Sequence, residues 1–349
     1  MQKIIKEFEF NGGIVEIMEN SLGLINNTYV LRSGSEKFIL QKINTNVFNN
    51  PIQLMENIYL ITNHINNLNK ISLEIIKNKQ GSLLVESDGD FWRAFKFIKS
   101  QVFLKIDDSS LIIECAKCLA NFHKDFSVFP FKKLHTVIPN FHNTPVIFDR
   151  FKEMLLHTSE SNKIECVSQI NYVLSKENDC KIIHNLILKK EIPLRVCHND
   201  PKISNILFDS KKKAICLIDL DTVMSGTILS DISDAIRTCC VSQSEEEIDL
   251  EKVFFKFDYF EIFIKSYLKV NYDNLNKIEL SNLVFSVELI FLEQGIRFLS
   301  DYFNGNKYFK VNHQKHNLLR ANNQLKLSKE IRNNKSKLQK ILDNIIHNF

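Results

Sequence analysis

The segment 196–222, VCHNDPKISNILFDSKKKAICLIDLDT, constrains this chain more than any other. Asp200 follows His198 by two residues, and Asn205 follows Asp200 by five. Asp219 stands at the end of the apolar stretch AICLI, so one short loop and a hairpin could bring these side chains together. Kinase-type phosphoryl transfer needs a carboxylate that faces the acceptor hydroxyl, and an amide oxygen and a second carboxylate that hold magnesium on ATP.

Asp200 is the candidate catalytic residue, because a carboxylate can orient a hydroxyl and accept its proton as the bond to phosphorus forms. The alternative is that Asn199, Asp200 and Pro201 form only a turn, which Asp-Pro favours. A turn does not explain why Asn205 and Asp219 follow at these spacings, and the catalytic interpretation is therefore preferred.

Further roles follow from the same segment. The Asn205 amide oxygen and the Asp219 carboxylate are ligands that a hard cation prefers. Asp221 shares a face with Asp219 if the strand persists that far, and it is either a second metal ligand or a carboxylate bonded to the loop. His198 is expected to hold the loop. Lys202 either neutralises the γ-phosphate or is solvated.

Composition excludes several classes of protein. The chain has 349 residues, 44% of them hydrophobic, which is enough for two lobes, and its 45 basic and 41 acidic residues are scattered, which argues against a nucleic-acid partner. Cys115 and Cys118 form a CxxC within a helical pattern and lack a second pair, so core cysteines are expected. Neither a secretory signal nor a run long enough to span a bilayer is present, which favours a cytoplasmic protein without a membrane partner.

The pattern along the chain changes near residue 98. An extended segment broken by Gly12 and Gly13 is expected over 8–17, and strands over 28–32, 37–43, 82–86 and 91–98. Hairpin turns are expected at 33–35 and 87–90, and a helix over 51–64. Beyond residue 98 helices are expected over 111–123, within 161–189 and from about residue 232 to the end, with short strands over 194–197, 206–208 and 214–218. These patterns predict an N-terminal lobe over 1–98 and a larger helical lobe over 99–349.

HNDPKISN followed by LIDLDT resembles the aminoglycoside phosphotransferase and choline kinase superfamily. The resemblance is closer still to the N-acetylhexosamine 1-kinases, and it covers nearly the whole chain. The blocks that carry it are LGLINNTYVL (22–31), FILQKIN (38–44), LMENI (54–58), FHNTP (141–145), IDLDTVMSG (218–226), SDISDAIRT (230–238), GIRFLSDYFNG (295–305) and YFKVNHQKHNLLRA (308–321).

The resemblance implies an α+β, two-lobed protein-kinase-like fold: an N-lobe with a five-stranded antiparallel sheet and a helix, a mainly helical C-lobe, and ATP between them. It implies that Asp200 is the catalytic base, that Asn205 and Asp219 hold Mg2+, and that Asp231 braces the loop. The implied nucleotide contacts are Ser21, Leu22, Asn26, Thr28, Gln41, Glu56, Phe95, Phe97, Ile98 and Lys202. The candidate sugar contacts are His142, Asn143, Arg297, Tyr308 and Arg320.

One departure concerns the nucleotide clamp. The superfamily usually has a lysine on the third strand, paired with a helix glutamate, but here Gln41 aligns with that lysine and Lys42 follows it. Strand alternation sends these two side chains to opposite faces, and Glu56 is available as the helix partner. For Arg297, an ion pair within the lobe is the alternative to a sugar contact.

The expected activity is phosphorylation of the anomeric hydroxyl of N-acetylglucosamine or N-acetylgalactosamine by ATP and magnesium. The alternatives are a kinase of the same fold acting on another hexose, an aminoglycoside or choline, and a pseudokinase that binds without turnover. The sequence leaves the epimer and the oligomeric state open, and a monomer is compatible with it.

Overall fold

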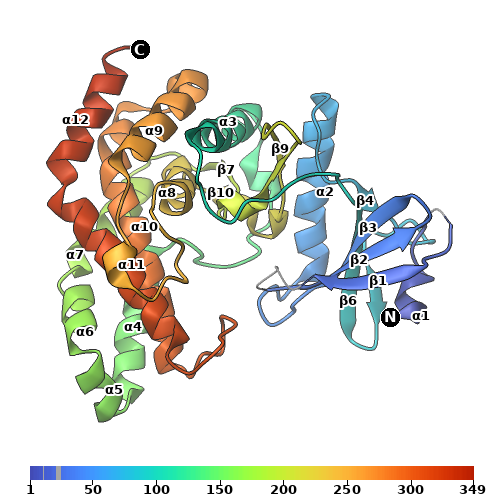
Figure 1. Cartoon of the computed structure of the whole chain (residues 1–349), viewed down its shortest axis with the longest axis horizontal. Coiled ribbons are helices and arrows are strands. Elements are labelled where there is room, and N and C mark those ends of the chain that lie inside the picture. Colours follow the sequence, from blue (N-terminus) through green and yellow to red (C-terminus); the bar gives the residue numbers. More distant parts are fainter. Residues whose placement is uncertain (11, 21–24) are drawn as a thin grey trace. The chain divides into compact units, whose positions relative to one another are not determined.

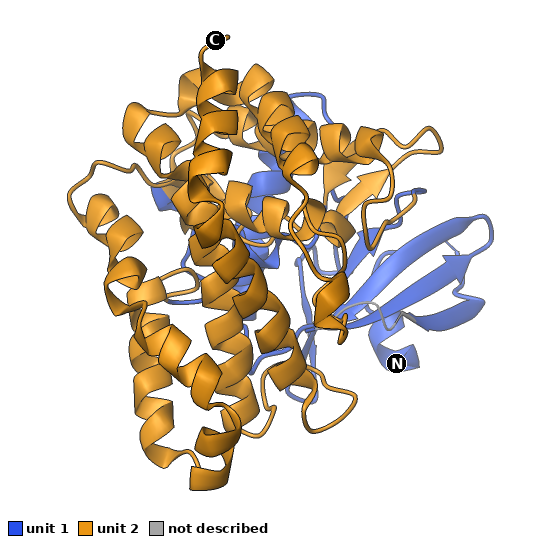
Figure 2. Ribbon diagram, turned by 60° about the vertical axis from the view of Figure 1, so that its left-hand side comes forward, with its two compact units in different colours: residues 1–100, 132–139, 218–224 blue, residues 101–131, 140–217, 225–349 orange. Residues whose placement is uncertain are grey.

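The computed structural model describes residues 1–10, 12–20 and 25–349 (Figure 1). The chain divides into two compact units, coloured separately in Figure 2. The smaller unit contains residues 1–100, 132–139 and 218–224, and the larger unit contains residues 101–131, 140–217 and 225–349. The boundary expected after residue 98 lies close to the end of the first segment, whereas the two later segments of the smaller unit had no sequence signal.

The smaller unit is built on an antiparallel sheet with the strand order β1-β2-β3-β6-β4, and β5 pairs with β6. Its elements are α1 (Gln2–Ile5), β1 (Glu16–Asn20), β2 (Asn27–Ser33), β3 (Glu36–Lys42), α2 (Pro51–Asn67), β4 (Ile75–Ile76), β5 (Val85–Ser87) and β6 (Asp90–Lys96). The resemblance implied five strands, and six are present among the described residues, because the two-residue β4 also pairs with β6.

The expected hairpins are confirmed. Gly34 turns β2 into β3 with φ of 58°, and Asp88 and Gly89 join β5 to β6 with φ of 56° and 80°. Two successive positive φ values suit the right-handed twist of paired strands.

The extended segment expected over residues 8–17, broken at Gly12 and Gly13, forms a strand only at its C-terminal end. In the structure Phe8 makes one isolated bridge to Asn78, and β1 begins only at Glu16. Gly12 interrupts the extended chain with φ of +79°, and a Cβ there would stand 2.8 Å from Ser33 Oγ. Only glycine suits that conformation and that close approach, so the chain cannot continue as a ladder through this point.

Alternating residues of three strands form the core of the smaller unit. Leu31 on β2, Phe38 and Leu40 on β3, and Trp92 and Ala94 on β6 are all buried in one cluster with residues of α1. The period of two in these strands places their apolar side chains on one face of the sheet.

Helix α2 explains why later segments belong to the smaller unit. Asn50 caps its N-terminus by accepting from Gln53 N, and Pro51 occupies the first turn, where its missing N–H costs nothing. The fully buried Asn57 donates to the backbone oxygens of His135 and Val223 at 2.9 and 3.0 Å, and its Oδ1 accepts from His135 N at 2.8 Å. One side chain therefore holds both segments.

The larger unit is mainly helical. Its helices are α3 (Ser109–Asp125), α4 (Thr144–His157), α5 (Glu160–Glu165), α6 (Val167–Leu174), α7 (Glu177–Leu188), α8 (Ile228–Cys239), α9 (Phe257–Asn271), α10 (Lys277–Phe303), α11 (His316–Asn333) and α12 (Lys335–Ile346). Its short strands β7 (Arg195–Cys197) and β10 (Met224–Gly226) form one pair, and β8 (Ile206–Phe208) and β9 (Ala214–Leu217) form another.

Helix α10 lies at the centre of this unit, with buried residues around most of its circumference. A capping box fixes its start, because Asn276 Oδ1 accepts from Glu279 N while Glu279 Oε2 accepts from Asn276 N. A Cβ at Gly295 would stand 2.6 Å from Leu325 Cδ2, so glycine is what permits the close approach of α10 and α11.

The α+β expectation is confirmed: an antiparallel sheet and a larger helical portion are both present. All eight cysteines are free, and Cys115 is buried on α3 as a core residue. None of the helices in the described part of the chain combines the length and the apolar character that crossing a bilayer would require.

Candidate active site

Asp231, at the start of α8, fixes the loop that carries Asp200. Its Oδ1 accepts from Asn199 N at 2.7 Å, and its Oδ2 accepts from His198 N at 2.7 Å and from His123 Nε2 at 2.9 Å. We call this set the Asp231 anchor. Asn199 has φ of 64°, a left-handed conformation that costs free energy and persists only where its surroundings hold it. The anchor therefore keeps a strained residue immediately before Asp200.

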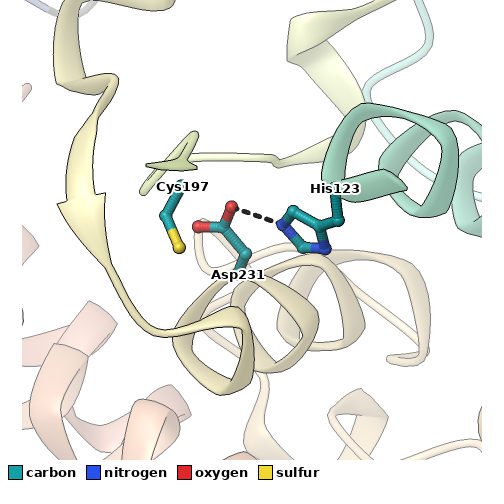
Figure 3. A group of neighbouring side chains, drawn as sticks. All are labelled: His123, Cys197 and Asp231. Atoms are coloured by element: carbon teal, nitrogen blue, oxygen red, sulfur yellow. Dashed lines mark hydrogen bonds and ion pairs between the residues drawn. The ribbon is translucent and has the colours of Figure 1, made fainter. Parts of the chain in front are cut away.

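His123, Cys197 and Asp231 each offer an atom within 4.8 Å of the others, the proximity of a metal site (Figure 3). The bonding favours a structural cluster instead. Both Asp231 oxygens accept hydrogen bonds, and His123 Nδ1 lies 2.6 Å from Tyr267 Oη. Burial, reinforced by the Asp231 charge, raises the pKa of Cys197 well above its ordinary value, so in the metal-free protein the sulfur is a thiol.

Asp200 is a half-buried carboxylate held by its own loop. Burial alone would raise the pKa of Asp200, but the charge and the hydrogen bond of Lys202 outweigh burial and lower that pKa below its ordinary value. Lys202 Nζ lies 2.7 Å from Asp200 Oδ2, and Asn205 Nδ2 donates to the same oxygen at 3.0 Å and to Asp200 O at 2.9 Å. His198 Nδ1 accepts from Asp200 N at 3.3 Å, a contact within the loop. Asp200 is thus ionised and fixed.

His142 contacts the same loop from outside it. One ring nitrogen lies 2.8 Å from Glu293 Oε1, and the other lies 3.0 Å from Asn199 O. Burial opposes protonation, but the Glu293 charge prevails and raises the pKa of His142, while His142 and Arg297 lower the pKa of Glu293 against the effect of burial. A protonated His142 can donate from both nitrogens, so it links α10 to the backbone before Asp200.

Two more of the candidate sugar contacts belong to the surroundings of Asp200. Arg297 pairs with Glu293 at 3.2 Å, its side chain only 17% exposed, and its guanidinium lies 4.6 Å from the ring centroid of Phe141. Partial burial raises the pKa of the Tyr308 hydroxyl, Arg297 opposes this, and the Asp200 charge adds to it. Tyr308 is 44% exposed. The ion pair expected as the alternative for Arg297 is therefore present, while Tyr308 is accessible and electrostatically linked to Asp200.

The other two candidate sugar contacts have structural partners. Asn143 caps α4 by accepting from Val146 N, and its Nδ2 donates to Asn140 Oδ1 at 3.1 Å. Arg320 is buried, and its nitrogens donate to Glu246 Oε1, to Lys310 O and to Asn317 Oδ1. These bonds leave both side chains committed to holding α4 and α11.

The smaller unit holds Asp219 and Asp221. The expectation that both carboxylates share a face depended on a continuing strand, but β9 ends at Leu217 and Asp219 is left-handed, with φ of 59°. Asp219 is exposed, whereas Asp221 is buried and accepts from Asn26 Nδ2 at 2.7 Å and from Arg93 at 2.8 Å. These partners of Asp221 lie before β2 and on β6, within the smaller unit.

The Gln41–Lys42 pair separates as strand alternation requires. Gln41 Oε1 accepts from Arg93 Nε at 2.9 Å, and Gln41 Nε2 donates to Thr28 Oγ1 at 3.0 Å. Lys42 lies on the other face and pairs with Asp90 at 2.7 Å. Glu56 pairs with His135 at 2.8 Å instead of with a residue of β3. The usual strand lysine and helix glutamate are thus replaced by other contacts.

The remaining nucleotide candidates lie at the end of β6 and before β2. Phe95 is buried and pairs with Ile39, Phe97 N donates to Lys37 O at 3.0 Å, and Ile98 O accepts from Ser100 Oγ at 2.9 Å. Ser21 and Leu22 lie outside the described residues.

The donor chemistry suits the cofactor that the sequence implies. Asn205 uses its amide nitrogen on Asp200, which leaves its oxygen on the opposite side of the amide group, and Asp219 offers an exposed carboxylate. Oxygen donors of this kind fit magnesium, a hard cation.

The sequence interpretation missed four residues. In the larger unit Glu293 pairs with His142, and Asp234 pairs with Arg237 at 2.7 Å, while in the smaller unit Arg93 bonds Gln41. Glu293 could have been found, because it stands four residues before Arg297 on one helix face. Arg93 had no local signal, because its partner Asp221 is 128 residues away.

Solved structures share this architecture. An aminoglycoside phosphotransferase from Alicyclobacillus acidocaldarius subsp. acidocaldarius DSM 446 has a TM-score of 0.64 at 12% identity, covering 99% of this chain and 96% of its own. A choline kinase from Cryptosporidium parvum Iowa II has a TM-score of 0.61 at 16% identity, covering 94% and 92%. Amicoumacin kinase hAmiN, solved with AMP-PNP, Ca2+ and Ami, has 0.64 at 11% identity, covering 95% and 92%.

The fold is therefore the α+β fold that small-molecule kinases of this class share. Residues 16–259 match the phosphotransferase enzyme family, APH. The chain belongs to that family.

Proposed function

We propose that this chain transfers the γ-phosphoryl group of magnesium-bound ATP to the anomeric 1-hydroxyl of an N-acetylhexosamine. The observation that carries the proposal is the state of Asp200: its carboxylate is kept ionised by Lys202, and its backbone is held by Asp231 and His142. Residues 1–98 would serve as the nucleotide-binding lobe and residues 99–349 as the catalytic and sugar-binding lobe.

Asp200 acts on the acceptor. Its free lone pairs orient the sugar hydroxyl and accept the proton as the new O–P bond forms and the bond to the leaving ADP oxygen breaks. A lowered pKa makes Asp200 a weak base. A weak base is sufficient for this reaction, because a loose phosphoryl-transfer transition state depends mainly on positioning and electrostatic stabilisation. Lys202 and Asn205 hold the Asp200 carboxylate in one orientation.

Asn205 and Asp219 are the proposed magnesium ligands, each through a side-chain oxygen. When bound, magnesium offsets the negative charge on the phosphates. On the nucleotide side we propose Asn26, Thr28 and Gln41, with the backbone of residues 95–98 for the adenine ring.

An uncharged acceptor suits the charges around Asp200. A cationic acceptor would seek unpaired acids or an aromatic cage, yet Glu293 is paired with His142 and Arg297. Asp301 accepts from Tyr308 N and Phe309 N. Tyr308 and Arg297 are left as the donors for sugar oxygens, and the sequence blocks that contain them resemble the N-acetylhexosamine 1-kinases.

The second candidate is an amino alcohol or aminoglycoside as acceptor. It is favoured by the aminoglycoside phosphotransferase and choline kinase folds to which the chain is similar. The third candidate is a pseudokinase, and it is supported by Gln41, which stands where the superfamily usually has a lysine.

The test is incubation of purified protein with ATP, magnesium and, in separate reactions, N-acetylglucosamine, N-acetylgalactosamine, choline and an aminoglycoside. ADP release is measured, and 31P NMR identifies a sugar 1-phosphate. We expect product with an N-acetylhexosamine and a loss of about 10²- to 10⁴-fold in kcat for Asp200→Asn.

Asp209→Asn is the matched control, because Asp209 lies in the turn after β8 and its Oδ1 accepts from the backbone amides of Lys211 and Lys213. Product only with an amine acceptor would replace the sugar proposal by the second candidate. Binding of magnesium ATP without turnover on any acceptor would favour the pseudokinase.

A further inference from the structure

The polar interior of the smaller unit converges on Arg93 of β6. Its side chain is 2% exposed, and it faces Gln41, its cross-strand neighbour on β3. Nε donates to Gln41 Oε1 at 2.9 Å, Nη2 donates to Asp221 Oδ2 at 2.8 Å, and Nη1 lies 2.6 Å from Asp221 Oδ1. The guanidinium thus contacts both oxygens of the carboxylate, but only Oδ2 accepts a hydrogen bond from it in the described part of the chain, and the close contact at Oδ1 is electrostatic.

Asp221 also connects Arg93 to the chain before β2. Asp221 Oδ2 also accepts from Asn26 Nδ2 at 2.7 Å, and Asn26 Oδ1 accepts from Asn44 N at 3.0 Å. We call Asp221, Arg93 and Asn26 the Asp221 anchor. It joins β6, the chain just before β2 and the 218–224 segment, in which Asp219 stands two residues before Asp221.

Direct contact between Arg93 and a phosphate does not fit these facts. The side chain is almost wholly enclosed, and each of its nitrogens already faces a partner. Any effect of Arg93 on a nucleotide must therefore pass through Asp221. A buried ion pair adds little net stability over apolar residues of the same volume, so the geometry that the pair enforces is the role to test.

We propose that Arg93 is a positioning residue for nucleotide binding. Its ion pair with Asp221 fixes the strained backbone at Asp219 and the neighbouring Asn26 in one arrangement. Arg93 thus contributes positioning in a chain where Gln41 replaces the usual lysine of the third strand. This inference rests on the proposed use of magnesium ATP, and it is independent of which acceptor is phosphorylated.

The test compares Arg93→Met, Arg93→Lys and the double variant Arg93→Met/Asp221→Leu with wild type. For each variant the Tm without ligand and the Kd for ATP are measured, once with magnesium and once with EDTA. Arg32→Met is the matched control, because Arg32 lies on β2 and pairs with Glu16 at the surface.

Arg93→Met should lower the Tm, because Asp221 keeps a buried charge without its partner. The double variant removes both charges and should recover most of the Tm, yet its Kd for magnesium ATP should stay about tenfold weaker, as when the competent arrangement is populated in about one molecule in ten. The Kd in EDTA should change much less, because Asp219 acts through the metal. Arg93→Lys keeps the charge but cannot bond Gln41 and Asp221 together as the guanidinium does, and it should fold with an intermediate Kd.

A double variant with the wild-type Tm and the wild-type Kd for magnesium ATP would overturn the inference, because Arg93 would then serve folding alone. If the double variant does not fold, Arg93→Lys provides the test. A wild-type Kd for magnesium ATP in Arg93→Lys would also overturn the inference. Wild type that binds magnesium ATP but makes no sugar 1-phosphate would refute the acceptor and leave this test valid. Wild type that binds no magnesium ATP would refute both.

Discussion

Two buried aspartates hold a strained turn of backbone, one in each unit, and they use different partners. Asp231 in the larger unit accepts from two backbone amides and from His123, next to the left-handed Asn199. Asp221 in the smaller unit pairs with a guanidinium, close to the left-handed Asp219. The Asp231 anchor relies mainly on main-chain donors that every sequence has, whereas the Asp221 anchor relies on a charge that one substitution removes. The two should therefore respond differently to the same chemical change.

The largest effect is expected from Asp221→Asn. The variant keeps the shape of the side chain but leaves the Arg93 guanidinium buried without a counter-charge, which should cost about 3–5 kcal/mol of the free energy of unfolding. Urea denaturation measures this loss. Asp343→Asn on the exposed face of α12 is the control, and a loss as small as the control's would show that the ion pair contributes no stability.

Asp231→Asn should cost less, about 1–3 kcal/mol. An amide retains one acceptor oxygen for the three donors, so at least one donor is left unsatisfied, but no buried charge is left behind. The same denaturation series gives the value. If Asp231→Asn proved more damaging than Asp221→Asn, the distinction between a main-chain anchor and an ionic anchor would fail.

Gly226→Ala tests the Asp231 anchor from the opposite side of the loop. A Cβ there would stand 2.7 Å from Asn199 Oδ1 and 3.1 Å from Cys197 Cβ, so the residue before Asp200 must shift. We expect a loss of about 1–2 kcal/mol in the free energy of unfolding. The kcat should fall by a larger factor than the KM for ATP changes. Gly13→Ala is the control, because a Cβ at Gly13 meets nothing within 4 Å; equal behaviour of the two variants would argue against the strain at Asn199.

The smallest effect, visible mainly in the pH profile, is expected from Lys202→Met. Since Lys202 lowers the pKa of Asp200 against burial, the variant should have a raised pKa, and the acid limb of kcat/KM should move to higher pH. The lowered pKa of Asp200 stabilises the folded protein at pH values above the ordinary pKa of 3.8, and this stabilisation is lost as the pH falls through the pKa of the folded state. The stabilisation should therefore be smaller in Lys202→Met. At pH 8 kcat should fall less than about tenfold.

Lys212→Met, which removes an exposed lysine paired with Asp108, is the control for that profile. A large rise in the KM for ATP at every pH, with the acid limb unmoved, would instead indicate that Lys202 contacts a phosphate.

The sequence predicted the parts of the site that are local. Asp200, Lys202 and Asn205 lie within six positions, and the loop and turn between β7 and β8 bring them together as their spacing indicates. The strands β2, β3 and β6 and the helix α2 were predicted within a few residues, because hairpin turns and a proline mark their ends.

The contacts that join distant segments could not be predicted in the same way. Arg93 in FWRAFK looks like any strand residue, and only the paired strands and a segment 128 residues later give it partners. The shared face of Asp219 and Asp221 depended on a strand that reached Asp221, and β9 ends at Leu217.

The assignment of residues 218–224 to the smaller unit has a practical consequence for anyone who would express a lobe by itself. A fragment that stops at residue 100 would contain Arg93 and Asn57 but lack Asp221 and Val223, the groups that they bind. A buried cation and an unsatisfied amide would remain in its interior, and the fragment would not be an autonomous module. The complementary fragment would contain Asp219 and Asp221 in the 218–224 segment but would lack the sheet of the smaller unit. Recombination between homologues would therefore preserve both anchors only if it exchanged three separate stretches of chain together.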